Sequence, residues 1–232
     1  MGALATPFIV DVADRAAVER LAEEVRDRFG PVSLLMNNAG VGSGADALSA
    51  PEAWSRVLGV NLMGVLNGVQ AFVPTMVTGD KPGMVINTGS KQGITQPPGN
   101  TAYNVSKAGV KALTEGLAHT LRERTGERVT AHLLIPGFTY TGMTRQRVVE
   151  KPPNAWTPEQ VVDFMFERLE AGDFYILCPD NEVTREMDEK RMVWAIGDLI
   201  ENRPALSRWH PAWQDRFAAF MAGNEGAPKR LE

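Results

Sequence analysis

The sequence predicts an α/β domain in which helices cover both faces of a parallel sheet, the doubly wound arrangement. Two observations lead to this prediction. Short apolar runs alternate with longer segments of helical periodicity along most of the chain, and most runs end in residues that favour turns. The 232 residues, of which 44% are hydrophobic, are enough for one domain with a sizeable core.

Five short apolar runs are predicted strands, because they have the length and the composition of buried parallel strands. They cover residues 8–10, 33–36, 84–86, 129–135 and 174–178. Polar residues that directly follow such a run lie at the carboxyl end of a strand, where open α/β sheets bind ligands.

Helices are predicted where apolar residues recur at intervals of three and four. These segments are residues 14–29, 51–58, 61–76, 102–124 and 157–172. Ser49-Ala50-Pro51-Glu52 and Thr157-Pro158-Glu159-Gln160 both have the form of a capping box with proline near the helix start. We therefore expect a defined first turn in two of the helices.

The last part of the chain differs from this pattern and is predicted to be a helical extension. Its apolar residues have helical spacing in two groups: Met187, Met192, Trp194, Ile196, Leu199 and Ile200, then Trp209, Trp213, Phe217 and Phe220. We divide the chain into a domain over residues 1–183 and an extension over residues 184–232 that packs on the same domain. The alternative is a lid or a partner surface, since aromatic residues are common in interface cores.

Composition narrows the classes of function. The formal net charge is −4 and no basic run stands out, so we expect no nucleic-acid partner. No apolar stretch approaches the ~20 residues of a membrane span, and no signal peptide pattern opens the chain, so we expect no membrane. The single cysteine, Cys178, suits a reducing cytoplasm. The three histidines lack metal-ligand spacing, so we expect no metal site.

One stretch carries the chemistry. Ser90 lies just past the predicted strand 84–86, and Tyr103 and Lys107 lie four residues apart near the start of a predicted helix, on one face of it. An ammonium near a phenol favours the phenolate, so we expect Lys107 to lower the pKa of Tyr103. A hydroxyl such as that of Ser90 could hold a substrate oxygen while Tyr103 moves the proton.

This stretch, Ser90 followed by Tyr103-Asn104-Val105-Ser106-Lys107, resembles the catalytic segment of the short-chain dehydrogenase/reductase family. Further stretches are similar to that family at matching positions between residues 6 and 180: Asp11-Val12, Asn38-Ala39-Gly40, Asn61, and Pro136-Gly137 followed by Thr141. Each is weak alone, but all occur in the family's order at strand ends or helix starts. The resemblance implies a Rossmann-like fold.

The resemblance implies an oxidoreductase that transfers hydride between a nicotinamide cofactor, NAD or NADP, and a small carbonyl or alcohol substrate. Tyr103 would move the proton, Lys107 would hold the nicotinamide ribose, and Ser90 would orient the substrate oxygen. Asn61 would hold a water in a proton relay. The cofactor would meet the remaining stretches: the adenine at Asp11 and Val12, the turn of Asn38, Ala39 and Gly40 beside it, and the carboxamide at Pro136, Gly137 and Thr141.

The sequence departs from the family at the pyrophosphate site. Members usually open with a strand, a Thr-Gly-x-x-x-Gly-x-Gly loop and a second strand, and these 232 residues contain no such loop. We therefore expect the first two strands to be missing and cofactor binding to be weak or absent. The cluster Gly40-Val41-Gly42-Ser43-Gly44 is interpreted as a turn. The alternative function is a non-catalytic binding or regulatory subunit.

The expected absence of the first two strands also leads us to expect that the chain forms oligomers. Without a neighbour, the strand at 33–36 becomes an edge that invites pairing. Either residues 8–11 pair directly with 33–36, or a second subunit covers the edge. In the family, the helices that here span 61–76 and 102–124 pair about a two-fold axis. We expect a homodimer or homotetramer.

Overall fold

The computed structural model describes residues 5–42, 44–145 and 149–223. Its sheet has four parallel strands, β1 (Leu34–Asn37), β2 (Gly83–Thr88), β3 (Val129–Ile135) and β4 (Tyr175–Leu177), in the order β1-β2-β3-β4. Met36 lies opposite Ile86 in β2, and Ile86 lies opposite His132 in β3. All four carboxyl ends therefore lie at the same edge of the sheet.

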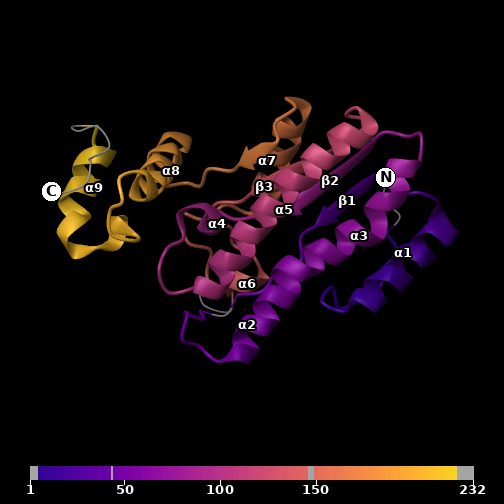
Figure 1. Ribbon diagram of the computed structural model, residues 1–232, viewed down its shortest axis with the longest axis horizontal. Coiled ribbons are helices and arrows are strands. Elements are labelled where there is room, and N and C mark those ends of the chain that lie inside the picture. Colours follow the sequence, from indigo (N-terminus) through magenta and orange to yellow (C-terminus); the bar gives the residue numbers. More distant parts are fainter. Residues whose placement is uncertain (1–4, 43, 146–148, 224–232) are drawn as a thin grey trace.

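Helices cover both faces of this sheet, as expected (Figure 1). On one face, α3 (Gly64–Thr78) and α5 (Thr101–Thr125) pack on β2 and β3 through a core of Val69, Val73, Met76, Val85, Leu121, Val129 and Ala131. On the other face, α7 (Pro158–Glu170) packs through Ile86, Leu134, Val161, Met165, Ile176 and Cys178. Val85 and Ile86 divide between the two cores because successive strand residues point to opposite faces. The doubly wound prediction is confirmed.

The helices near the beginning of the chain lie beyond α3. Helix α1 (Arg15–Phe29) starts at Asp14, whose side chain accepts a hydrogen bond of 3.1 Å from the Ala17 amide. It packs against α3 (Figure 1), and Val18 is its one buried residue among those described. The predicted helix at 14–29 is confirmed, although it is more exposed than its apolar spacing indicates.

The two predicted capping boxes have different outcomes. At α7 the box forms between Thr157 and Gln160. At α2 (Pro51–Leu58) the residue before the helix is Ala50, and it makes no capping bond. The Ser49 hydroxyl instead donates to the Asp46 carboxylate at 3.0 Å. Since Asp46 engages the hydroxyl, the prediction of a capping box at Ser49 is wrong.

The predicted strand at residues 8–10 does not form. Ile9 is fully exposed, and within the described residues β1 pairs with β2 alone. A strand needs a partner on at least one side, and this segment has none in the part of the chain described. The expected direct pairing of residues 8–11 with 33–36 is therefore wrong. Leu34 and Met36 of β1 are 48% and 38% exposed.

Helices α2 and α3 are joined by a π-helical turn, η1 (Gly59–Met63), into one continuous helical stretch. This stretch, Pro51–Thr78, is long and apolar enough to cross a membrane, which the sequence analysis did not predict. Length and composition alone are a weak indication, and Val65, Val69 and Val73 are buried against the protein core as in an ordinary core helix. That the chain has no membrane partner stays a prediction.

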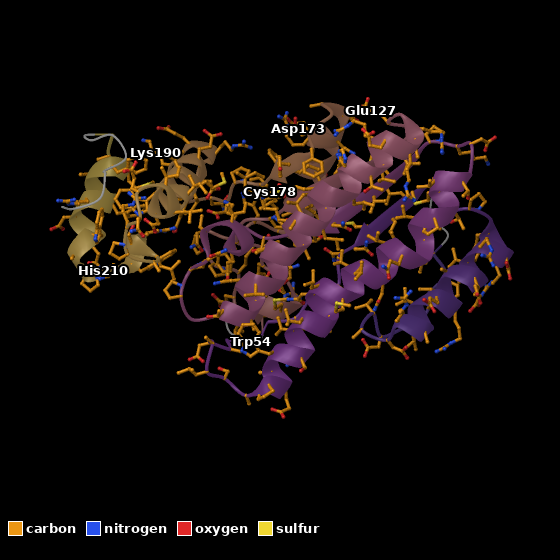
Figure 2. All side chains as sticks on the ribbon, in the orientation of Figure 1. Trp54, Glu127, Asp173, Cys178, Lys190 and His210 are labelled. Carbon is orange, nitrogen blue, oxygen red and sulfur yellow. The ribbon has the colours of Figure 1, made fainter. Side chains whose placement is uncertain are left out.

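The end of the chain forms the first predicted helix of the extension in full and the second only in part, because Trp209 and Trp213 lie in short 3₁₀ turns and only Phe217 and Phe220 lie in an α-helix. After β4 the chain continues as α8 (Arg185–Ile200), η2 (Ser207–Trp209), η3 (Pro211–Trp213) and α9 (Gln214–Met221). Two short helices, α4 (Gln92–Thr95) and α6 (Gly142–Arg145), lie earlier in the chain. These last elements project from the body (Figure 1) around Trp194, whose ring meets those of Trp213, Phe217 and Phe220 at centroid distances of 6.3, 5.2 and 5.3 Å. Cys178, labelled in Figure 2, is buried where the body leads into this extension. The boundary at residue 184 stays a prediction.

Candidate active site

The candidate site lies where β2 ends and α5 begins. Ser90 follows β2 by two residues, and Tyr103 lies in the first turn of α5. Helix α4 packs directly on α5: a Cβ on Gly93 would lie 2.5 Å from the carbonyl carbon of Lys107, so the position admits only glycine without a shift. This packing turns the chain after Ser90 back toward α5. The Ser90 hydroxyl lies close enough to Tyr103 to act on its pKa.

Lys107 lies beside this pair and is 4% exposed. Its ammonium donates to the Thr88 carbonyl at 2.7 Å and lies 5.8 Å from the centroid of the Tyr103 ring. Burial lowers the pKa of Lys107 to about 8. The structure therefore brings Ser90, Tyr103 and Lys107 together at the carboxyl end of β2, as the sequence predicts.

The ionisation of Tyr103 differs from the expectation. Burial raises the pKa of Tyr103, and the nearby Ser90 hydroxyl acts in the opposite direction without reversing the shift. Lys107 was expected to lower this pKa, but the ammonium lies 5.8 Å from the ring centroid and its own pKa is lowered by burial. The expected depression of the Tyr103 pKa is wrong in this structure, because desolvation disfavours the phenolate.

Asn61 is fully buried in the π-helical turn η1. Its carboxamide oxygen accepts from the Val41 amide at 2.7 Å, and its nitrogen donates to the Val41 carbonyl at 2.9 Å and to the Ser106 hydroxyl at 3.2 Å. Ser106 in turn donates to the Tyr103 carbonyl at 2.7 Å. The side chain thus ties the loop after β1 to the first turns of α5. A π-turn inside a helix often marks a functional site.

The turn of Asn38, Ala39 and Gly40 lies near the same centre. The Asn38 carboxamide accepts from the Thr88 hydroxyl at 3.0 Å, which joins the ends of β1 and β2. A Cβ on Gly40 would lie 3.5 Å from the Asn61 oxygen and 3.9 Å from the Lys107 nitrogen. Ser43, in the neighbouring glycine cluster, lies outside the described residues.

Asp11 and Val12 lie apart from this centre, against α3. The Asp11 carboxylate accepts from the Ala13 amide at 2.9 Å, and the Val12 carbonyl accepts from Asn67 at 2.9 Å. Among the described residues, no hydrogen bond joins either of them to Tyr103 or Lys107. Their predicted contact with adenine stays a prediction.

Pro136 and Gly137 follow β3 and are closely packed. A Cβ on Gly137 would lie 2.9 Å from the Asp180 carboxylate and 3.1 Å from the Lys91 nitrogen. Thr141 precedes α6, and its amide donates to the Thr144 hydroxyl at 2.6 Å. The carboxyl end of β3 thus lies beside the residue that follows Ser90.

Two buried polar groups escaped the sequence analysis. Asn87 joins the sheet to its helices, because it accepts from Asn37 at 2.8 Å and donates to Thr114 at 3.0 Å. The sequence shows an asparagine near the end of each of two predicted strands, Asn37 and Asn87, and this pattern could have indicated the hydrogen bond between them. Lys91 lies 2.5 Å from Asp188 of α8 and 3.5 Å from Asp180. No local sequence pattern predicts this ion pair, which links the candidate site to the extension.

The donors present suit a nicotinamide cofactor. Lys107 has three N–H donors, and within the described residues its one hydrogen-bond acceptor is the Thr88 carbonyl. A buried ammonium with free donors, beside the turn at Gly40, fits the hydroxyls of a ribose. Acceptors and donors that could meet the rest of the nicotinamide half lie on Asn38 and Thr141.

Comparison with known proteins agrees with this arrangement. A profile of the family described as short chain dehydrogenase matches residues 2–152. The chain is 32% identical over 169 residues to the 3-oxoacyl-(acyl-carrier-protein) reductase FabG of Thermotoga maritima, covering 72% of this chain and 63% of that protein. It is 37% identical over 163 residues to the probable oxidoreductase EphD of Mycobacterium bovis, covering 70% of this chain and 26% of that protein. It spans less than two thirds of either relative.

Solved structures give the same result. A short chain dehydrogenase/reductase from Burkholderia phymatum in complex with NAD superposes with a TM-score of 0.73 at 33% identity, covering 84% of this chain and 75% of that one. A putative short-chain dehydrogenase from Novosphingobium aromaticivorans has a TM-score of 0.68 at 30% identity, covering 93% of this chain and 75% of that one. The motifs, the fold and these likenesses agree, and the chain belongs to the short-chain dehydrogenase family.

Proposed function

We propose that this chain carries the catalytic centre of an NAD- or NADP-dependent oxidoreductase that acts on a small carbonyl or alcohol substrate. The observation that carries the proposal is the convergence of the Ser90 and Tyr103 side chains beside the buried ammonium of Lys107. Relatives named as reductases and oxidoreductases, and neighbours solved with NAD or NADP, support it.

The cofactor would supply or accept the hydride. On this chain, Lys107 would bind the nicotinamide ribose, and Asn38, Ala39 and Gly40 would form the wall beside it. Pro136, Gly137 and Thr141 would meet the carboxamide. Asp11 and Val12 would meet the adenine ring, on the side of the sheet where β1 has its free edge.

Tyr103 would donate the proton to the substrate oxygen during reduction. Since burial raises its pKa, Tyr103 is protonated at neutral pH, which is the form that an acid requires. Ser90 would share the oxygen with Tyr103, and the positive charge of Lys107 would stabilise the phenolate formed. Asn61 would conduct the proton outward; its carboxamide already holds Val41 and Ser106, so its contribution begins with fixing this loop.

We further propose a cytoplasmic homodimer or homotetramer, with the open edge of β1 and the helices α3 and α5 as the contact surfaces. Leu34 and Met36 on that edge are partly exposed, which supports a cover by a second copy. The 232-residue chain is proposed to bind nicotinamide dinucleotides weakly, because the amides that usually hold the pyrophosphate have no counterpart in its sequence.

A non-catalytic binding or regulatory subunit is the second candidate. The open edge of β1 favours it, because that edge leaves the adenine side without a neighbouring strand within the described residues. Cofactor binding separates the two candidates more directly than any structural feature of the candidate site.

The test combines binding with turnover. Thermal unfolding is followed with increasing NAD(H) and NADP(H), and oxidation of the reduced cofactors is followed with a panel of aldehydes and ketones. The enzyme requires a rise in unfolding temperature at high cofactor and turnover with at least one carbonyl compound. Absence of both, at millimolar cofactor, would leave the binding subunit as the function.

A further inference from the structure

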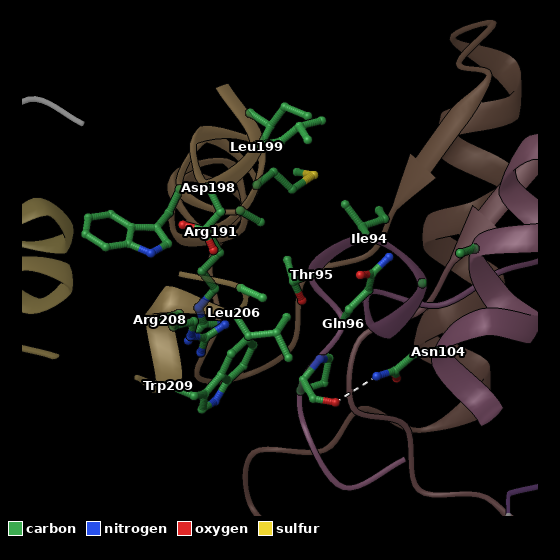
Figure 3. A pocket seen from close by; sticks show the side chains of 18 of the residues that line it. Ile94, Thr95, Gln96, Asn104, Arg191, Asp198, Leu199, Leu206, Arg208 and Trp209 are labelled. Atoms are coloured by element: carbon green, nitrogen blue, oxygen red, sulfur yellow. Dashed lines mark hydrogen bonds between the residues drawn. The ribbon is translucent and has the colours of Figure 1, made fainter. Parts of the chain in front are cut away.

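A large cavity lies between α4 and α5 on one side and the C-terminal extension on the other. Its volume is about 1130 Å³, and Figure 3 shows side chains of the body and of the C-terminal extension on its two sides. The residues of α5 that line it include Asn104, Val105, Ala108 and Ala112, while none of the four predicted catalytic residues lines it. It is a second site, and an inference about it does not depend on the proposed oxidoreductase activity.

The walls of this cavity are largely apolar. Val105 and Ala108 form part of the α5 side, and Leu199, Leu206 and Trp209 form part of the opposite side. Leu199 is 79% exposed and Val105 is 45% exposed. Apolar walls that leave this much surface in water favour a ligand with an apolar body.

Four cations line the cavity: Arg203 pairs with Asp198 and Lys111 pairs with Glu115, and the other two are Arg191 and Arg208. Figure 3 shows Arg191 and Arg208 with their guanidinium groups toward one another beside Leu206 and Trp209. The Nε atom of Arg191 is buried without a hydrogen bond. Arg208 packs over the rings of Trp209 and Phe217 at 4.7 and 5.1 Å. No carboxylate of the described chain lies within ion-pair distance, 4.0 Å, of Arg208.

The two carboxylates near these arginines, Asp188 and Asp198, form closer ion pairs with other cations. Asp188 lies 2.5 Å from Lys91 and 3.8 Å from Arg191, so its stronger partner is the lysine. Asp198 lies 2.9 Å from Arg203 and also accepts from the amide of Ser207 at 2.9 Å.

The pair of guanidinium groups is therefore poorly compensated. Burial lowers the pKa of Arg208 to about 10, the charge of Arg191 acts in the same direction, and the charge of Asp188 opposes them without reversing the shift. Two like charges in a partly desolvated cavity attract an anion.

We propose that this cavity binds a small organic carboxylate with an apolar body. Arg191 and Arg208 hold the carboxylate, since the planar fork of a guanidinium matches the two carboxylate oxygens. The apolar body lies between α5 and α8, along Val105, Ala108 and Leu199. The volume exceeds the lower bound of ligand pockets, ~300 Å³, by a wide margin, so a chain or ring system fits.

The probe is decanoate, titrated calorimetrically into the whole chain, with decanamide as the neutral compound of the same shape. Decanoate should bind ~10-fold more tightly than decanamide. Arg208→Gln should weaken decanoate binding ~10-fold, whereas Arg208→Lys, which keeps the charge, should weaken it less. Arg185→Gln is the matched control: Arg185 lies on α8 outside the cavity, paired with Glu189 at 2.7 Å, and its loss should change nothing.

A second test of the proposed binding fills the cavity by a substitution and leaves both arginines in place. Ala112→Trp adds an indole from an exposed position of α5 and should abolish decanoate binding while the thermal unfolding temperature is kept. Equal binding of decanoate and decanamide, or decanoate binding unaffected by Ala112→Trp, would overturn the proposal. So would a loss of dimer in Ala112→Trp, measured by sedimentation, with no decanoate binding to the original chain. The cavity would then be a contact between copies.

Discussion

Replacing Lys107 by methionine should stabilise the fold at neutral pH. The ammonium is 4% exposed, and burial lowers its pKa from 10.5 to about 8. Each pKa unit corresponds to ~1.4 kcal/mol, so burying the charged form costs ~3 kcal/mol. The substitution also removes the hydrogen bond to the Thr88 carbonyl, worth ~1 kcal/mol and somewhat more if that carbonyl is left unpaired. The expected net gain is ~1 to 2 kcal/mol.

The pH dependence identifies the cause. Below pH 8 the folded and unfolded states both hold the proton of Lys107, so the cost is fully present. Between the folded pKa of about 8 and the ordinary value of 10.5, the unfolded state binds more protons, so stability rises with pH. The advantage of Lys107→Met should therefore be largest at pH 7 and should shrink by ~2 kcal/mol or more by pH ~10.

Denaturant unfolding at pH 7 and at higher pH measures both quantities. Lys111→Met is the matched control, because Lys111 lies on the same helix, is 38% exposed and pairs with Glu115 at 2.7 Å. It should change stability by less than ~1 kcal/mol at either pH. A Lys107→Met protein less stable than the original at pH 7, or a difference that stays constant with pH, would refute the reasoning.

Three further outcomes follow from packing and charge. Asp188→Asn removes a buried carboxylate, the closest partner of the Lys91 ammonium, and should cost ~3 kcal/mol in denaturant unfolding; a loss below ~1 kcal/mol would contradict this. Leu121→Ala opens a cavity at a residue 1% exposed and should cost ~2 to 5 kcal/mol by the same measurement; an unchanged midpoint would show the site to be collapsible. Lysine at both Leu34 and Met36 should dissociate an oligomer built on the β1 edge; light scattering that shows the same mass would exclude that contact.

Local patterns predicted most of the sheet and much of the candidate site. The spacing of Tyr103 and Lys107 fixed their common helix face, and the apolar run before Ser90 placed that hydroxyl at a strand end. Four of five predicted strands and the main helices formed, because each carries its own periodicity. The Thr157 capping box was readable for the same reason, since all its contacts lie within four residues.

The predictions that were wrong or missing concern interactions between groups distant in the sequence, or competition for a hydrogen bond. Residues 8–10 have the composition of a strand, but a strand exists only with a neighbour. Ser49 has the capping pattern, but Asp46 takes its hydroxyl. The direction of the Tyr103 pKa depends on burial that no spacing reveals. The ion pair of Lys91 with Asp188 needed the path of the whole chain.

Tyr103 is the group proposed to move the proton. The most direct test is carbonyl reduction by Tyr103→Phe compared with the original chain, at saturating reduced cofactor. Tyr175→Phe is the control, because Tyr175 is a partly exposed tyrosine on β4 bonded to Glu115. Tyr103→Phe should keep its fold and lose turnover by ~10²- to 10⁴-fold, while Tyr175→Phe keeps it. Full turnover in Tyr103→Phe would contradict the account.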